Sequence, residues 1–119
     1  MNAELTISNK NKNGLLSILI NNVFIGCKIN TGAQCNVLPA KLFENLSEKE
    51  AGRKHKMQTA NVNLIAYGGT KIEVVGSTQV NCIIRSKEVL VTLLIVITVG
   101  RPILGLETCL EQKLIKKIE

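Results

Sequence analysis

Short runs of aliphatic and β-branched residues, separated by turn-forming residues, occupy most of this chain and constrain its fold more than any other feature. Residues 15–20 and 23–29 are two such runs, and Asn21-Asn22 between them tolerates the left-handed backbone of a tight turn. Aromatic residues make up only 3% of the 119 residues, so the core must be built from Ile, Val and Leu, which favour strands. We therefore predict an all-β domain whose first two strands form a hairpin.

A second hairpin is predicted near the middle of the chain. Residues 62–67 and 71–75 are β-rich arms on either side of a glycine tip at Gly68-Gly69. The next glycine, Gly76, is expected to separate this hairpin from a further strand at residues 79–85.

The most apolar stretch, residues 89–99, is expected to be a buried strand that follows a charged turn at residues 86–88. It contains two Thr and is far shorter than the roughly 20 apolar residues that a membrane helix requires. We therefore predict a soluble protein with no membrane span and no membrane partner.

Two short helices and a terminal strand complete the predicted domain. Pro39 needs no amide donor in the first turn of a helix, and a helix over residues 39–46 would place three apolar side chains on one face. Residues 106–112 carry leucines in helical register, and the β-branched tail at 114–118 is expected to pair as a strand. Because no repeat or linker is found, residues 1–119 are predicted to form one domain.

The formal net charge of +6 has two interpretations. The cations are scattered, apart from a run at residues 53–56, and they either form a solvated surface or attract an acidic or nucleic-acid partner. No aromatic platform for bases lies among them. We therefore favour a solvated surface and expect no nucleic-acid partner.

The four cysteines show no pattern of metal binding. There is no C-x-x-C pair and only one His, so we predict no metal and no cofactor. Their even number would permit two disulfides, but the polar, acidic residues 1–4 are unlike a signal peptide. We therefore expect free thiols in a cytoplasmic, reducing compartment, with Cys27, Cys35 and Cys109 slow to react in the folded protein.

Three short motifs occur in an informative order. They are Asn30-Thr31-Gly32-Ala33 after the second strand, Ala66-Tyr67-Gly68-Gly69 at the second hairpin, and Ile103-Leu104-Gly105 before the second helix. In this order they resemble the active-site loop, the flap and the hydrophobic-hydrophobic-Gly motif of retropepsins. These are the aspartic proteases of retroviruses and gypsy-like LTR retrotransposons, with relatives in genes domesticated from such elements. The resemblance covers about residues 15–118.

The resemblance implies a closed β-barrel, half of an acid protease, with a flap hairpin and one or two short helices. Its activity in the family is hydrolysis of peptide bonds in polypeptides by a water molecule activated between two carboxylates. Two such acids lie close enough that only one ionises near neutral pH, so one takes a proton while the other donates one. This chain has one such loop, so a complete site requires two chains on a two-fold axis. A homodimer is therefore implied.

The resemblance also assigns roles to the loop residues. Asn30 occupies the position of the catalytic Asp, the hydroxyl of Thr31 bonds across the two-fold axis, and Gly32 brings the backbone close to the reacting groups. Ala33 keeps the floor of the cleft narrow.

The other two motifs are expected to act around this loop. Gly68 and Gly69 let the flap, which includes Ala66, bend over a peptide substrate, and Tyr67 gives the hairpin a ring to pack. Ile103-Leu104-Gly105 supports the loop from below, where Gly105 permits a close crossing.

Asn30 changes the expected chemistry. An amide has nearly the shape of a carboxylate and can keep the hydrogen bonds of the loop, but it neither ionises nor takes up a proton at physiological pH. We therefore predict turnover at or near zero. Either Asn30 replaces an Asp to trap an inactive enzyme, or the sequence is a natural pseudoprotease.

Two readings from other classes stay open. The first is a pseudoprotease that uses the same cleft as a peptide-binding or dimerisation module. The second is a small basic β-barrel that binds nucleic acid, although the aromatic or Arg-rich surface that this would need is missing. Two local departures from the family also stand out, because Lys113 lies where relatives commonly have a helix-ending Gly and Ile97 where they often have an acidic residue.

Overall fold

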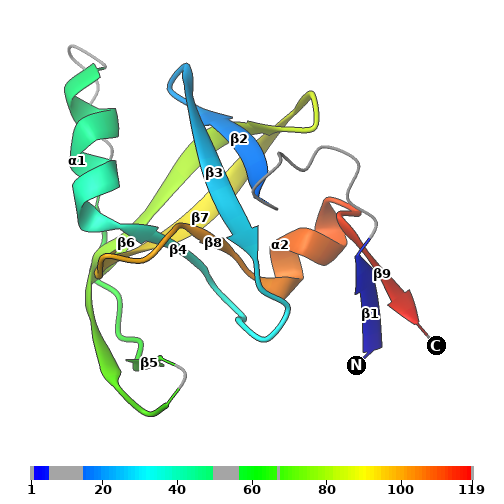
Figure 1. Cartoon of the computed structure of the whole chain (residues 1–119). Coiled ribbons are helices and arrows are strands. Elements are labelled where there is room, and N and C mark those ends of the chain that lie inside the picture. Colours follow the sequence, from blue (N-terminus) through cyan, green and yellow to red (C-terminus); the bar gives the residue numbers. More distant parts are fainter. Residues whose placement is uncertain (1, 6–14, 50–56, 67, 119) are drawn as a thin grey trace.

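The computed structural model describes residues 2–5, 15–49, 57–66 and 68–118 (Figure 1). Strands arranged around a closed ring form its barrel. In spatial order the ring contains β2 (Leu16–Ile20), β3 (Val23–Ile29), β8 (Ile103–Leu104), β4 (Asn36–Pro39), β7 (Lys87–Ile97) and β6 (Lys71–Ile84). Pairing of β2 with β6 closes the ring, and β5 (Leu64–Ile65) pairs with the part of β6 that extends beyond it. The predicted all-β fold is confirmed.

The core fills the inside of this barrel. Alternate residues of β2 and β6 are buried, which is the pattern of strands with one face on a core and the other in solvent. The largest fully buried side chains are aliphatic, as the scarcity of aromatic residues predicts: Leu16, Ile20, Leu38, Ile84, Ile95, Leu104 and Leu114.

The first hairpin forms as predicted. Asn21 and Asn22 have φ values of 51° and 62°, which are the left-handed values that a two-residue hairpin turn requires. The register pairs Ile20 with Val23 across this turn, so the buried faces of β2 and β3 both point into the barrel.

The prediction that Gly76 separates two strands is wrong. β6 runs without a break through Gly76, where its register with β7 shifts by a β-bulge. A Cβ on Gly76 would lie 2.7 Å from the carbonyl oxygen of Gln58, which exchanges two backbone hydrogen bonds with Ser77. The glycine therefore allows another segment to approach closely and does not end the strand. The turn that follows β6 is also shifted, because the positive φ values lie at Arg85 and Ser86 and β7 already begins at Lys87.

Both predicted helices are present with altered bounds. Pro39 ends β4, where it pairs with Val96, and α1 (Ala40–Lys49) starts one residue later and runs beyond Leu46. The second helix, α2 (Leu106–Glu111), lies almost where it was predicted. None of the helices within the described ranges is long and apolar enough to cross a membrane.

The chain ends form a separate two-stranded sheet beside the barrel (Figure 1). The predicted terminal strand is β9 (Ile115–Ile118), and its partner is β1 (Asn2–Leu5), which the sequence did not reveal. The register places Asn2 opposite Ile118.

All four cysteines are free thiols. Burial raises the pKa of Cys27 to about 12 and the pKa values of Cys82 and Cys109 to about 11. The prediction for Cys35 is not supported, because this residue is only partly buried while Cys82 is almost fully buried. Cys82 sits on an inward position of β6, and Cys35 lies in the loop before β4.

Candidate active site

The loop that carries Asn30 leaves the end of β3 and is fixed by backbone hydrogen bonds to a distant part of the chain. The amide of Asn30 donates to the carbonyl oxygen of Leu104 over 3.1 Å, and the amide of Leu106 donates to the carbonyl oxygen of Ala33 over 2.7 Å. A third bond, from the amide of Ala33 to the carbonyl oxygen of Asn30 at 3.1 Å, closes the turn. The first and third sequence motifs are therefore brought together, as predicted.

The side chain of Asn30 takes part in the same turn. Its Oδ1 accepts a hydrogen bond from the backbone amide of Gly32 at 3.0 Å. A Cβ on Gly32 would lie 3.3 Å from that oxygen, which is closer than most Cβ contacts in proteins. Glycine at this position therefore lets the backbone lie close to the Asn30 amide. Thr31 and Gly32 are exposed at the surface of the loop, and Ala33 is half-buried.

Gly105 passes directly beneath this loop. A Cβ at this position would lie 2.7 Å from the carbonyl oxygen of Cys35 and 2.9 Å from that of Ala33. Both contacts are with backbone, so neither can be relieved by turning a side chain. The short strand β8 that leads to Gly105 is inserted between β3 and β4. The close crossing expected at Gly105 is present.

Asn36 is a site residue whose importance the sequence did not reveal. Its side chain is buried, and its Oδ1 accepts a hydrogen bond from the amide of Gly105 at 2.9 Å. Its Nδ2 donates to the carbonyl oxygen of Thr92 at 3.1 Å and to the hydroxyl of Thr108 at 2.8 Å. One amide thus connects β4, β7 and α2. The available signal was a polar residue at the start of a strand that is otherwise apolar.

We use the name floor for residues 30–36 together with residues 103–108. Within the floor, backbone and amide hydrogen bonds join two segments that are far apart in sequence. This arrangement orients Asn30 with a fixed hydrogen-bond pattern and leaves the outer surface of the loop exposed.

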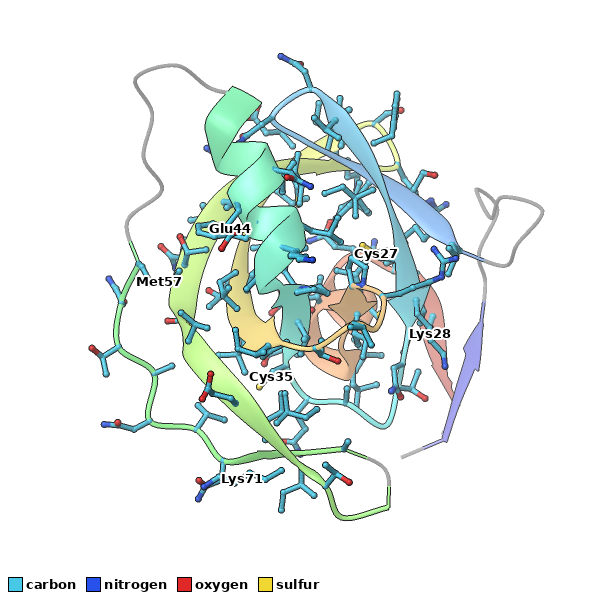
Figure 2. All side chains as sticks on the ribbon, turned by 60° about the vertical axis from the view of Figure 1, so that its left-hand side comes forward. Cys27, Lys28, Cys35, Glu44, Met57 and Lys71 are labelled. Carbon is cyan, nitrogen blue, oxygen red and sulfur yellow. The ribbon has the colours of Figure 1, made fainter. Side chains whose placement is uncertain are left out.

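The second motif forms the tip of the hairpin between β5 and β6, which we call the flap (residues 64–72). The amide of Ala66 donates to the carbonyl oxygen of Thr70 at 2.7 Å, and the amide of Gly69 donates to that of Ala66 at 3.0 Å. Gly68 and Gly69 have φ values of 98° and 91°, which other residues rarely adopt. Tyr67 lies outside the described residues. The flap and the Asn30 loop lie toward the same end of the barrel (Figures 1 and 2).

The cations near the loop are Lys28 and Arg101, and the floor itself contains one exposed acid, Glu107. Lys28 is exposed two residues before Asn30, and its backbone amide donates to the carbonyl oxygen of Pro102 at 2.9 Å. Arg101, the residue before that proline, is also exposed. The whole chain contains no Asp, since its nine acidic residues are all Glu.

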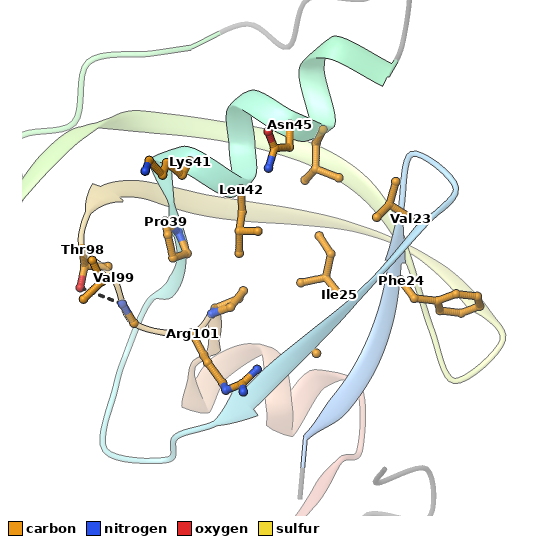
Figure 3. A pocket seen from close by; sticks show the side chains of 14 residues that line it. Val23, Phe24, Ile25, Pro39, Lys41, Leu42, Asn45, Thr98, Val99 and Arg101 are labelled. Atoms are coloured by element: carbon orange, nitrogen blue, oxygen red, sulfur yellow. Dashed lines mark hydrogen bonds between the residues drawn. The ribbon is translucent and has the colours of Figure 1, made fainter. Parts of the chain in front are cut away.

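A separate groove of about 720 Å³ lies on the outer side of the barrel, between β3, α1 and residues 98–102 (Figure 3). Its lining includes Phe24, Leu42, Val99 and Arg101 but no residue of the floor. The described part of the chain holds no group of three His, Cys, Asp or Glu side chains placed to bind a metal ion.

The comparisons with known proteins agree with this geometry. No family model matches the chain, and no curated protein matches it. Among solved structures, EIAV protease complexed with the inhibitor HBY-793 has a TM-score of 0.70 at 18% identity, with 96% of each chain covered. The retroviral protease-like domain of Ddi1 from Leishmania major has a TM-score of 0.61 at 15% identity, covering 83% of this chain and 76% of that one.

At these identities the likeness establishes the fold and nothing further. The chain has the retropepsin fold, an all-β closed barrel with two short helices. The site residues and the activity rest on the chemistry of the loop itself.

Proposed function

We propose that this chain is a retropepsin-type aspartic endopeptidase domain that works as a homodimer on peptides or polyproteins, and that Asn30 leaves it without hydrolytic activity. The order of its motifs supports an origin in a gypsy-like retrotransposon or in a gene domesticated from one. Its free cysteines support a cytoplasmic, reducing location.

One observation carries this proposal. The hydrogen bond from the amide of Gly32 to Oδ1 of Asn30 holds the side chain in the position that a carboxylate would need. A carboxylate there could share a proton with its counterpart across a two-fold axis, whereas an amide cannot take up or release one. The positioning machinery is present, and the proton-transferring group is missing.

The homodimer follows from the number of loops. One chain supplies one Asn30 loop, whose residues Thr31 and Gly32 are exposed and free to face a second copy. The sheet formed by β1 and β9 offers a second contact surface. Two like charges would repel across the axis in an Asp version, so the Asn30 dimer should be no weaker.

The alternative is a natural pseudoprotease that uses the cleft to bind peptides or to dimerise. The intact floor supports this alternative. The hydrogen bond between Asn36 and Gly105 and the close crossing at Gly105 are retained, although they cannot serve catalysis without an acid at position 30. The flap glycines needed to close over a peptide are also retained.

The test is cleavage of a peptide library by the chain and by Asn30→Asp at several pH values. We expect turnover only in the variant, with an acidic-to-neutral optimum and inhibition by a pepstatin-like transition-state mimic. Dimers that mix the two chains should stay strongly impaired. Equal cleavage by both versions would refute the assignment of the acid pair, and dimerisation without cleavage by either would favour the pseudoprotease.

A further inference from the structure

The orientation of the Asn30 amide is fixed by the chemistry of its neighbour. The backbone amide of Gly32 can only donate a hydrogen bond, so the group that faces it at 3.0 Å must be the oxygen Oδ1. The Nδ2 group therefore points elsewhere. Among the described residues it has no hydrogen-bond acceptor, and the side chain is only partly buried.

Two such amides at a two-fold axis have a surplus of donors. Each amide has two N–H donors and an oxygen with two lone pairs, one of which is already used by Gly32. Even if each remaining lone pair accepts a hydrogen bond from the amide of the other chain, one donor per chain is left over. In the proposed homodimer these donors are left to bind a ligand. A pair of aspartates that shares one proton has the opposite character, because it has a surplus of acceptors and a negative charge.

Most charged residues around the loop are cations, although the floor also contains the exposed Glu107. The segments that build the loop, the flap and the neighbouring strands, residues 15–43, 57–72 and 89–106, contain no Asp or Glu. They contain these cations: Lys28, Lys41, Lys71 and Arg101. Lys28 lies on β3 and Lys71 at the flap (Figure 2), and Arg101 lies beside β3 (Figure 3).

The positions of the cations make them available to a ligand. Lys28 occupies the face of β3 that points away from the core, because Ile25 and Cys27 occupy the inward face. The backbone bond between Lys28 and Pro102 brings Arg101 close to the same end of β3. Both side chains are exposed, and a homodimer would double their number. Four acids lie directly next to these segments in the sequence, and all four are exposed: Glu44, Glu73, Glu88 and Glu107.

We propose that the paired Asn30 amides, with Lys28 and Arg101 around them, form a carboxylate-binding site in the cleft. This inference rests on the proposed homodimer. The two free N–H donors match the two oxygens of a carboxylate, and charge-assisted hydrogen bonds are about twice as strong as neutral ones. The carboxylate comes from an acidic side chain or from the C-terminus of a peptide. Replacing Asp by Asn thus turns a cleft that repels carboxylates into one that selects them.

The experiment uses calorimetric titration of the full chain with three hexapeptides of one apolar sequence, acetylated at the N-terminus. The first has a central Gln and an amidated end, the second a central Glu and an amidated end, and the third a central Gln and a free C-terminal acid. The chain should bind the second or the third at least about tenfold more tightly than the first. The second and third peptides distinguish a side-chain carboxylate from a terminal one.

Substitutions show which side chains cause the preference for peptides that carry a carboxylate. Asn30→Ala should abolish the preference, and Asn30→Asp should reverse it, because its carboxylates repel the ligand. Arg101→Gln and Lys28→Gln should each reduce it several-fold, whereas the remote Lys113→Gln should not change it. Persistence of the full preference in Asn30→Ala would overturn the proposal.

Sedimentation of the same samples separates this inference from the proposed function. A dimer that binds all three peptides equally would overturn the carboxylate site and leave the proposed function intact. A monomer that binds none of them would overturn both.

Discussion

The floor and the flap differ in how tightly their conformations are determined. The floor buries the amide of Asn36, and Gly105 there has backbone carbonyls within 3 Å of where its Cβ would be. The flap tip is exposed, and a Cβ on Gly68 or Gly69 would meet no atom within 4 Å. The conformation of the floor is therefore determined by steric crowding, whereas the conformation of the flap tip depends on the backbone freedom of its glycines. Within the floor, Nδ2 of Asn30 has no hydrogen-bond acceptor among the described residues.

The largest effect should come from Gly105→Ala. The added methyl group would clash with two backbone carbonyls, so the floor must open, and we expect a loss of about 3 kcal/mol in the free energy of unfolding. Gly100→Ala is the matched control, because its Cβ would have only an ordinary contact at 3.6 Å. Urea unfolding of both variants measures the difference. Equal stabilities would show that the floor is not crowded.

Asn36→Ala should follow closely. It removes three hydrogen bonds and leaves the amide of Gly105 without its acceptor, which should cost about 2–3 kcal/mol. Asn81→Ala, at an exposed position of β6, should change the stability by less than about 0.5 kcal/mol. Equal effects of the two substitutions in chemical denaturation would show that the hydrogen bonds of Asn36 do not stabilise the floor.

Alkaline pH should weaken the barrel through its buried thiols. Their pKa values in the folded chain lie above the ordinary value of 9.0, so the folded state retains protons that the unfolded state loses. The stabilising contribution is complete below about pH 9 and is lost as the pH rises toward 11 and 12. Each thiol adds a slope of up to about 1.4 kcal/mol per pH unit. Melting curves of the chain and of Cys27→Val between pH 8 and 11 test this, because the variant should show the shallower slope.

Gly69→Ala should have a smaller effect on stability and a distinct effect on binding. A side chain at φ 91° is strained by roughly 1 kcal/mol, but no neighbouring atom is displaced. Thermal unfolding should therefore change little while the affinity for peptides falls. A loss of stability as large as that of Gly105→Ala would contradict the view that the flap is loosely determined.

The smallest effect should be a gain from Lys113→Gly. Lys113 has a φ of 55° at the end of α2, where the amides of Lys113 and Leu114 donate to the carbonyl oxygens of Leu110 and Cys109. This left-handed helix end favours glycine, so the substitution should add about 0.5–1 kcal/mol. Lys113→Ala should not, because alanine also disfavours a positive φ. Both are compared by denaturant unfolding.

The local rules of sequence reasoning succeeded where residues interact with near neighbours. The turn at Asn21-Asn22 and the flap glycines both depend on backbone preferences that single residues express. Asn36 and Gly76 were misjudged because their roles depend on segments distant in sequence, Gly105 in one case and Gln58 in the other. The pairing of β9 with β1 was missed for the same reason.

β6 belongs to both the barrel and the flap, and this sharing has a mechanical consequence. β6 pairs with β7 from Glu73 to Ile84, its C-terminal end also pairs with β2, and its N-terminal end pairs with β5. Any displacement of the flap must therefore bend this strand or slide it against β7, and the bulge at Gly76 is the point where the ladder is already interrupted. Gln58 is bonded to the strand there by two backbone hydrogen bonds with Ser77. Movement of the flap tip is therefore transmitted along β6 into the barrel. The bulge at Gly76, where Gln58 is bonded to the strand, is the position about which the flap would bend.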